Sequence, residues 1–266
     1  MPYIHDLMNQ SLLVVVTGVF AVLAVASELG FLAGRWLSHK LGKNKASDDD
    51  VDNNVSTITN SALGLLALFL GFTFSSAMDH FEKNREAVTN EATAIAAAYQ
   101  VINLQPEPFK NRLLTGLGQY IDIRLKVADL PSDPQAIRQL QQAGRQAQKQ
   151  LWATAESLTE KLPNSPLLES LTDALNDLVA AEKTRTENLL NGVPNGLFMP
   201  VALFLLFNGV LMGLSLGEGT RRHALLSWGL YFLVALAVGI IVDLDRPLKG
   251  FINVDQQAMT LLKDNL

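Results

Sequence analysis

Residues 64–99 read GLLALFLGFTFSSAMDHFEKNREAVTNEATAIAAAY. The first half of this stretch is apolar enough to lie in a lipid bilayer, whereas the second half mixes charged residues with alanine. No proline separates the two halves, so nothing within the stretch ends a helix. We therefore expect one helix that begins in the membrane and continues into water to about residue 104.

One face of this expected helix repeats every 3.5 residues, which is typical of helices that pack along a seam. Steps of four and three residues from Asn60 give the seam positions: Gly64, Ala67, Gly71, Phe74, Met78, Phe81, Arg85, Val88, Ala92, Ile95, Tyr99 and Ile102. Its membrane half is rich in small residues, which let helix backbones approach closely. Two partners remain open: other helices of the same chain, or the same helix in further copies around an axis.

Three more segments are apolar over about the 20 residues that a bilayer span needs: 11–37, 196–217 and 223–242. Together with 61–78, they predict an all-α, four-span integral membrane protein with an extramembrane helical bundle built on its extended second span. Spans 1 and 2 fall within residues 1–81, the bundle within 82–193, and spans 3 and 4 within 194–245.

Proline residues divide the polar segment into stretches of helical length, near 107–129, 134–161 and 166–191. The tail, residues 246–266, predicts a short amphipathic helix. We expect its apolar face to consist of Val254, Ala258, Leu261 and Leu262.

Basic residues gather in the two short loops between spans, with Lys43 and Lys45 in one and Arg221 and Arg222 in the other. The positive-inside rule then predicts that both loops are cytoplasmic, and that the termini and the bundle are extracytoplasmic. The chain contains no cysteine, which suits either side of a bacterial inner membrane. The N-terminus lacks the basic region of a signal peptide, so we expect the first span to be retained.

Glu28 is the acidic residue that lies well inside a predicted span. An ionisable group within the membrane is a candidate functional residue. Glu28 either forms a structural polar contact with another span, or lines a permeation path or carries a proton.

Acidic residues also mark two predicted span ends. Asp79 and Glu82 share a helix face where the second span leaves the membrane, and would form an acidic ring in an oligomer or simply face solvent. Asp243, Asp245 and Arg246 close the fourth span. They either clamp that span to the bundle or lie at the mouth of a conduction path.

Several function classes find no support in the sequence. The net charge of −5 and the pI near 5.4 argue against nucleic acid as a partner. The four histidines are scattered, without a metal-binding motif, and no phosphate-binding or catalytic motif is present. We therefore expect neither an enzyme nor a cofactor or metal site.

Three stretches together resemble the bacterial bestrophin-like membrane proteins: SELGFLAGR (27–35), the stretch 64–99 quoted above, and IVDLDRPLKGFINV (241–254). The resemblance covers nearly the whole chain. It implies a homo-oligomeric ion channel related to pentameric anion channels. The polar positions that share the family pattern, without assigned roles, are Glu28, Asp79, Asp243, Asp245 and Arg246.

The sequence thus leads to the hypothesis of a homo-oligomeric ion channel in the bacterial inner membrane, whose partners are the lipid bilayer, further copies of itself and inorganic ions. We expect Asn60, Gly64, Gly71 and Ser75 to line its pore, with Asp79 at the outer mouth. The resemblance implies anions, whereas the acidic residues favour cations, and we favour cations. The alternative is a membrane-anchored sensor or scaffold whose extracytoplasmic bundle binds a ligand or a protein partner.

Overall fold

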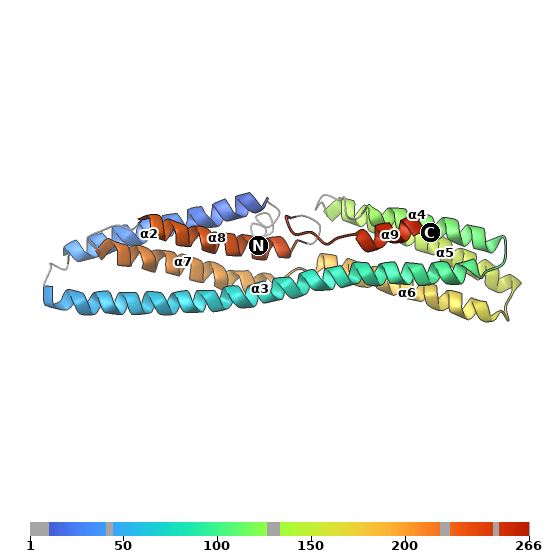
Figure 1. The fold of residues 1–266 in the computed structure, drawn as a ribbon, viewed down its shortest axis with the longest axis horizontal. Helices are drawn as coiled ribbons and strands as arrows, with labels where there is room; N and C mark the ends of the chain where they lie inside the picture. The colour runs from blue at the N-terminus through green and yellow to red at the C-terminus, as the bar shows by residue number, and fades with distance from the viewer. Residues whose placement is uncertain (1–10, 41–44, 127–133, 219–223, 247–249, 266) are drawn as a thin grey trace. The chain divides into compact units, whose positions relative to one another are not determined.

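The computed structural model describes residues 11–40, 45–126, 134–218, 224–246 and 250–265 (Figure 1). All regular secondary structure within these ranges is helical, which confirms the all-α prediction. The helices are α2 (Leu12–Lys40), α3 (Lys45–Asn103), α4 (Phe109–Leu125), α5 (Pro134–Lys161), α6 (Pro166–Leu190), α7 (Asn195–Glu218), α8 (Ala224–Leu244) and α9 (Gln257–Asn265).

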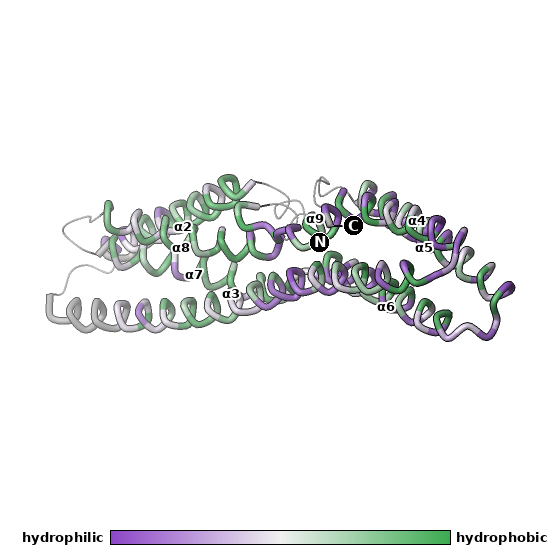
Figure 2. The backbone as a smooth tube through the Cα atoms, turned by 45° about the vertical axis from the view of Figure 1, so that its right-hand side comes forward, coloured by the Kyte–Doolittle hydropathy of each residue, from purple (hydrophilic) through white to green (hydrophobic). Residues whose placement is uncertain are grey.

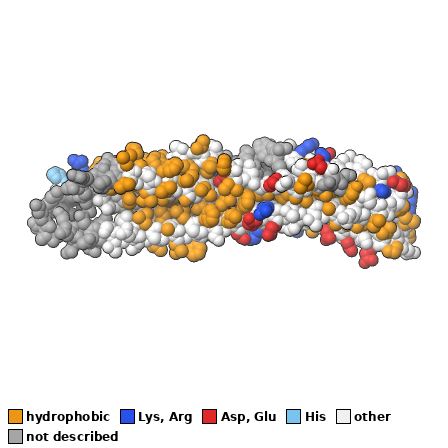
Figure 3. Space-filling view, in the orientation of Figure 1, with side chains coloured by type: hydrophobic (Ala, Val, Ile, Leu, Met, Phe, Trp, Pro, Cys, Tyr) orange, Lys and Arg blue, Asp and Glu red, His pale blue; other side chains and the backbone are white. Residues whose placement is uncertain are grey.

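The chain divides into two compact units. The membrane unit consists of Met1–Asp79 with Val193–Asp245, and the bundle unit of His80–Gly192 with Arg246–Leu266. Four helices are long and apolar enough to cross a membrane: α2, α3, α7 and α8. Figure 2 shows hydrophobic residues along α2, α7, α8 and the middle of α3, and Figure 3 shows hydrophobic side chains gathered over the membrane unit.

The helix α3 confirms the extended second span, because it runs without a break from Lys45 to Asn103. It begins well before the predicted apolar span of 61–78. The apolar part, 61–78, is the part that we assign to the bilayer, and α3 continues from His80 to Asn103 in the bundle unit.

Glycine residues bring α2 and α7 into direct backbone contact in the membrane unit. A Cβ atom placed on Gly30 would overlap the carbonyl oxygen of Val210, and one placed on Gly213 would overlap that of Ser27. Small residues are the usual means of close helix approach in lipid, where apolar side chains gain little by leaving the acyl chains. The glycines of the SELGFLAGR stretch therefore serve the packing of α2 on α7.

Polar and aromatic contacts complete the membrane unit. The rings of Phe69 on α3 and Phe204 on α7 stack with their centroids 4.9 Å apart. The side-chain amide of Asn208 on α7 donates to the carbonyl oxygen of Ala62 on α3 over 3.2 Å. These contacts fix which face of α3 is turned toward α7.

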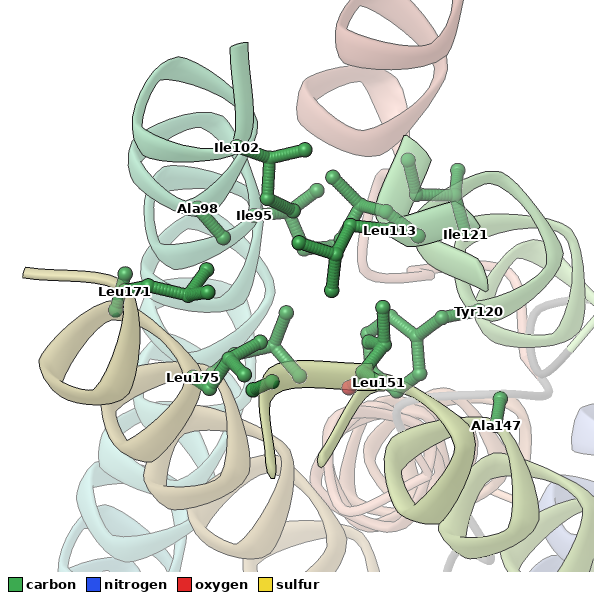
Figure 4. Close-up of a cluster of buried hydrophobic side chains, with 14 of the residues drawn as sticks. Ile95, Ala98, Ile102, Leu113, Tyr120, Ile121, Ala147, Leu151, Leu171 and Leu175 are labelled. Atoms are coloured by element: carbon green, nitrogen blue, oxygen red, sulfur yellow. The ribbon is translucent and has the colours of Figure 1, made fainter. Parts of the chain in front are cut away.

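The bundle unit is held together by a continuous hydrophobic core. Figure 4 shows Ile95, Ala98 and Ile102 of α3 turned toward Leu113 of α4 and Leu171 of α6. The helices α5 and α6 fall close to their predicted bounds, whereas α4 begins two residues later than predicted, and residues 127–129 of the prediction lie outside the described residues.

The tail also packs on this core, but in a different register from the expected one. The helix α9 begins at Gln257, whose backbone N–H donates to Asp255 Oδ1 over 2.8 Å. Met259 is therefore fully buried, whereas Leu261 is exposed. The prediction of Leu261 on the apolar face was wrong, because it assumed that the helix begins near Val254.

Candidate functional site

The predicted pore-lining residues lie on one uncovered face of α3. Asn60, Gly64, Gly71, Ser75 and Asp79 are all exposed on the protomer. A Cβ atom placed on Gly64 or Gly71 would meet no described atom within 4 Å. We call these five residues the open face.

The opposite side of the same helix segment is covered by the rest of the membrane unit. The buried residues of this side are Thr59, Ala62, Leu66, Thr73 and Ala77. The other spans thus cover the opposite side of α3 and leave the polar side chains of the open face exposed. In a bilayer such a face requires water or another protein surface, because lipid offers no hydrogen bonds.

The predicted heptad seam divides between the two alternatives that the sequence left open. In the bundle unit, Val88, Ala92, Ile95 and Ile102 are buried against helices of the same chain. In the membrane unit, the seam positions Gly64, Ala67 and Gly71 are exposed. The described part of the chain therefore supplies a partner for the bundle half of the seam and leaves the membrane half uncovered.

The acidic residues near the end of the apolar part of α3 differ in environment. Asp79 is exposed, at the end of the membrane unit. Glu82 forms an exposed ion pair with Arg85, with 3.5 Å between Oε2 and Nη1. His80 Nε2 lies 3.0 Å from the carbonyl oxygen of Asn188 on α6. The structure thus ties His80 to the bundle, and Glu82 to a neighbouring base.

Glu28 lies on the exposed side of α2. Its neighbour Ser27 is buried and forms a polar contact between spans, in which the Tyr231 hydroxyl of α8 donates to Ser27 Oγ over 2.6 Å. The sequence analysis did not predict the Ser27–Tyr231 pair. An exposed carboxylate this far within a span remains costly in lipid, by at least about 2.5 kcal/mol on insertion scales.

Asp243 and Asp245 are buried at the end of α8. The backbone N–H of Val193, just before α7, donates to Asp245 Oδ1 over 2.7 Å. Asp245 therefore satisfies a buried backbone group and ties the chain entering α7 to the end of α8. Arg246 follows as the first residue of the returning bundle segment and is half-buried.

The strongest polar cluster of the molecule was missed by the sequence analysis. Glu91 of α3 is fully buried in the bundle and accepts hydrogen bonds from three side chains. Tyr120 Oη lies 2.6 Å from Oε1, Arg124 Nε lies 2.5 Å from Oε1, and Arg185 Nη1 lies 2.6 Å from Oε2. We call these four residues the Glu91 network.

Two further groups extend the Glu91 network. Arg124 Nη1 donates to Glu182 Oε1 over 3.4 Å, and Arg185 Nη2 donates to Gln256 Oε1 over 2.8 Å. The network therefore joins α3, α4, α6 and the segment before α9. Two guanidinium groups face two carboxylates, so the buried charges balance.

Electrostatics in the Glu91 network follow from burial and charge pairing. Burial by itself raises the pKa of Glu91, but the adjacent Arg124 and Arg185 outweigh burial and hold the pKa below the usual 4.5. Burial, together with the neighbouring Glu91 carboxylate, raises the pKa of Tyr120 well above its usual 10.0. Glu91 is therefore ionised and Tyr120 is a hydrogen-bond donor at neutral pH.

A metal centre is not supported by the part of the chain that the structure describes. No group of three or more His, Asp or Glu side chains there is placed to hold a metal ion. The polar chemistry of the described residues is therefore that of the open face, of paired buried charges and of hydrogen bonds between helices.

The family of the chain follows from comparison with known proteins. The family model of the Bestrophin-like domain matches residues 25–259. The chain belongs to the bestrophin-like family. The match includes Glu28, the open face, the Glu91 network and the charged end of α8, so all of these features belong to the family domain of a multi-pass membrane protein.

Solved structures show the same fold in this bestrophin-like chain. One variant of the bacterial bestrophin homologue from Klebsiella pneumoniae has 14% identity and a TM-score of 0.68, covering 96% of this chain and 97% of that one. A second variant has 14% identity and a TM-score of 0.67, covering 94% and 97%. A crystal structure described as a membrane protein has 14% identity and a TM-score of 0.65, covering 94% and 96%. No curated protein sequence matches the chain.

Proposed function

We propose that this bestrophin-like protein is a homo-oligomeric ion channel of the bacterial inner membrane, with the open face of α3 lining the pore. The observation that supports the proposal is the exposure of Asn60, Gly64, Gly71 and Ser75 on one side of a spanning helix. The bacterial bestrophin homologues share the fold at low identity. This similarity supports the fold, and we propose the assembly into several copies, the conducted ion and the orientation in the membrane in addition.

The polarity of the open face favours contact with water over contact with lipid. A hydroxyl such as that of Ser75 loses its hydrogen bonds to water in an acyl environment, at a cost of several kcal/mol in the least favourable case. Gly64 and Gly71 expose backbone where a side chain would otherwise shield it. A face of this kind is stabilised by a wet axis shared among several copies.

The residues beside the open face have the opposite character. Leu65 and Phe72 are large, apolar and exposed on the adjoining side of α3. Lipid or a neighbouring copy would stabilise such side chains, whereas water would not. Phe74 and Met78 are also exposed, on the same side of α3 as Gly64 and Gly71, and would face the shared axis or a neighbouring copy.

Charge at the end of the open face suggests the preferred ion. Copies of Asp79 around an axis would form an acidic ring, which raises the local concentration of cations. We propose cations on this ground, although the family resemblance implies anions. The basic residues of the short loops favour the extracytoplasmic side for this proposed ring, by the positive-inside rule.

Ion flux through purified protein in liposomes tests the proposal. We expect K⁺ or Na⁺ flux in the wild type and its loss in Gly71→Leu, because a leucine at this position would fill the shared axis. Gly229→Leu is the matched control, since Gly229 is an exposed glycine of α8 with no described atom near its Cβ position. An intact oligomer without flux under any ion gradient or voltage would overturn the channel and favour a sensor or scaffold.

A further inference from the structure

The outer face of α2 combines an apolar stripe with a basic, aromatic end. Val25, Leu29, Leu32 and Trp36 recur at spacings of four, three and four residues, so they lie on one side of the helix. Each of these side chains is between 59% and 62% exposed. The apolar span of α2 ends at Trp36, with Arg35 directly before it and His39 and Lys40 within the next turn or so.

The basic end of this stripe is organised around the Trp36 ring. The Lys40 ammonium lies 4.7 Å from the centroid of the ring, a cation–π contact. Arg35 and His39 are exposed in the same two turns. Glu28, which is exposed and lies one turn from both Val25 and Leu32, borders the stripe, whereas no acidic residue occurs from Leu29 to Lys40.

We propose that this face of α2 binds an anionic phospholipid. Its acyl chains lie along Val25, Leu29 and Leu32, and its phosphate is held by Arg35 and Lys40 beside Trp36. The guanidinium of Arg35 matches the geometry of a phosphate, and Lys40 adds a point charge. The indole of Trp36 occupies the depth that tryptophan prefers, between acyl chains and headgroups.

The dimensions of the site select a membrane lipid as its occupant. Eleven residues separate Val25 from Trp36, which is roughly 16 Å along a helix axis. One leaflet of a bilayer has a hydrocarbon thickness of about 15 Å. The apolar stripe therefore matches the length of one lipid, and the basic end coincides with the plane of its phosphate.

This inference is independent of the channel proposal. It depends on α2 alone, whereas the channel proposal depends on the open face of α3. A bound anionic lipid also gives a reason for the basic residues at the end of α2, where neutral polar residues would be enough to end the span.

Tryptophan fluorescence provides a direct test. The chain has three tryptophans, so the double variant Trp152→Phe/Trp228→Phe leaves Trp36 as the reporter. This protein is placed in liposomes containing equal mole fractions of brominated phosphatidylglycerol or brominated phosphatidylcholine. We expect the anionic lipid to quench Trp36 at several-fold lower mole fraction than the neutral lipid does.

Charge variants distinguish a lipid site from ordinary contact with the bilayer. Adding Arg35→Gln and Lys40→Gln should remove the preference, so that both lipids quench equally. Adding Arg145→Gln and Lys149→Gln, two exposed basic residues of α5 in the bundle unit, should leave the preference intact. The pair Arg35→Lys and Lys40→Arg, which keeps both charges, should retain most of it and controls for misfolding.

Three results would overturn the proposal. The first is equal quenching by both lipids in the Trp36 reporter, and the second is a preference that survives Arg35→Gln/Lys40→Gln. The third is release of the anionic lipid by millimolar inorganic phosphate, which would identify free phosphate as the ligand and leave the apolar stripe without a role.

Discussion

Arg185 Nη1 of α6 lies 2.6 Å from Glu91 Oε2 of α3, and both side chains are almost completely removed from solvent. This contact is the centre of a network in which every carboxylate oxygen of Glu91 has a donor. A buried charge is tolerated only with such compensation. The network thus joins the helix that we propose as the pore lining to the bundle around its second half.

Replacement of Glu91 by glutamine should destabilise the protein strongly. The variant leaves two buried guanidinium groups with one carboxylate fewer, and a broken buried pair costs about 3–5 kcal/mol. Thermal or denaturant unfolding in detergent measures the loss. Glu82→Gln on the same helix is the control, because its ion pair with Arg85 is exposed and contributes at most about 1 kcal/mol. Equal effects of the two substitutions would show that the Glu91 network does not support the bundle.

The Glu91 network should also make stability depend on pH in the acidic range. The pKa of Glu91 is lowered in the folded bundle, chiefly by Arg124 and Arg185 acting against burial. Its contribution is therefore complete above the unfolded value of about 4.5 and is lost as pH falls through the lower folded value. Unfolding midpoints measured from pH 7 to pH 3 should fall more steeply in wild type than in Glu91→Gln. Parallel curves for the two proteins would contradict this assignment.

Leucine at Gly30 should disrupt the membrane unit, because its Cβ would overlap the backbone of Val210. Helices α2 and α7 would have to separate, and overpacking of this kind typically costs about 1–3 kcal/mol or more. Gly18→Leu on the same helix is the control, since Gly18 is exposed and has no described atom near its Cβ position. The yield of monodisperse protein and its thermal midpoint report the difference. Tolerance of leucine at Gly30 would show that α2 and α7 are not closely packed.

Removal of the charge at Asp79 should weaken the preference for cations. Asp79→Asn keeps the size of the side chain and eliminates the proposed acidic ring, so the cation-to-anion permeability ratio should fall several-fold. Reversal potentials in asymmetric KCl measure this ratio. Asp177→Asn, an exposed acid of α6 in the bundle unit, should have no effect. An unchanged ratio in Asp79→Asn would place the selectivity elsewhere.

The sequence was sufficient to predict most of the fold, because hydropathy and the 3.5-residue seam are local patterns. It placed α3 across the membrane boundary and located α5 and α6 by their prolines. It did not predict that α3 begins at Lys45, because residues 45–60 are mostly polar and show no periodic pattern of apolar residues. The register of α9 was also wrong, because short helices depend on the core on which they pack.

The candidate site was only partly accessible from the sequence. The open face was visible as small residues at seam positions, and the structure finds these residues exposed. Glu91 was missed because the seam was traced through Val88 and Ala92. A seam traced through Asn84, Val88, Glu91 and Ile95 would have placed an acid at a core position. Its partners Arg124 and Arg185 lie 33 and 94 residues further along the chain, so no local sequence pattern predicts the contact.

Water accessibility of the open face tests the channel proposal most directly. The chain has no cysteine, so single cysteines at Gly64, Gly71 and Ser75 can be introduced without background. Controls lie at Leu65 and Phe72 on the exposed apolar side and at Leu66 on the buried side. In intact membranes, we predict that a charged, water-soluble thiol reagent modifies the three open-face cysteines much faster than the controls. Failure to modify any open-face cysteine in a correctly assembled protein, or equal modification of both exposed sides, would contradict a water-filled path along α3.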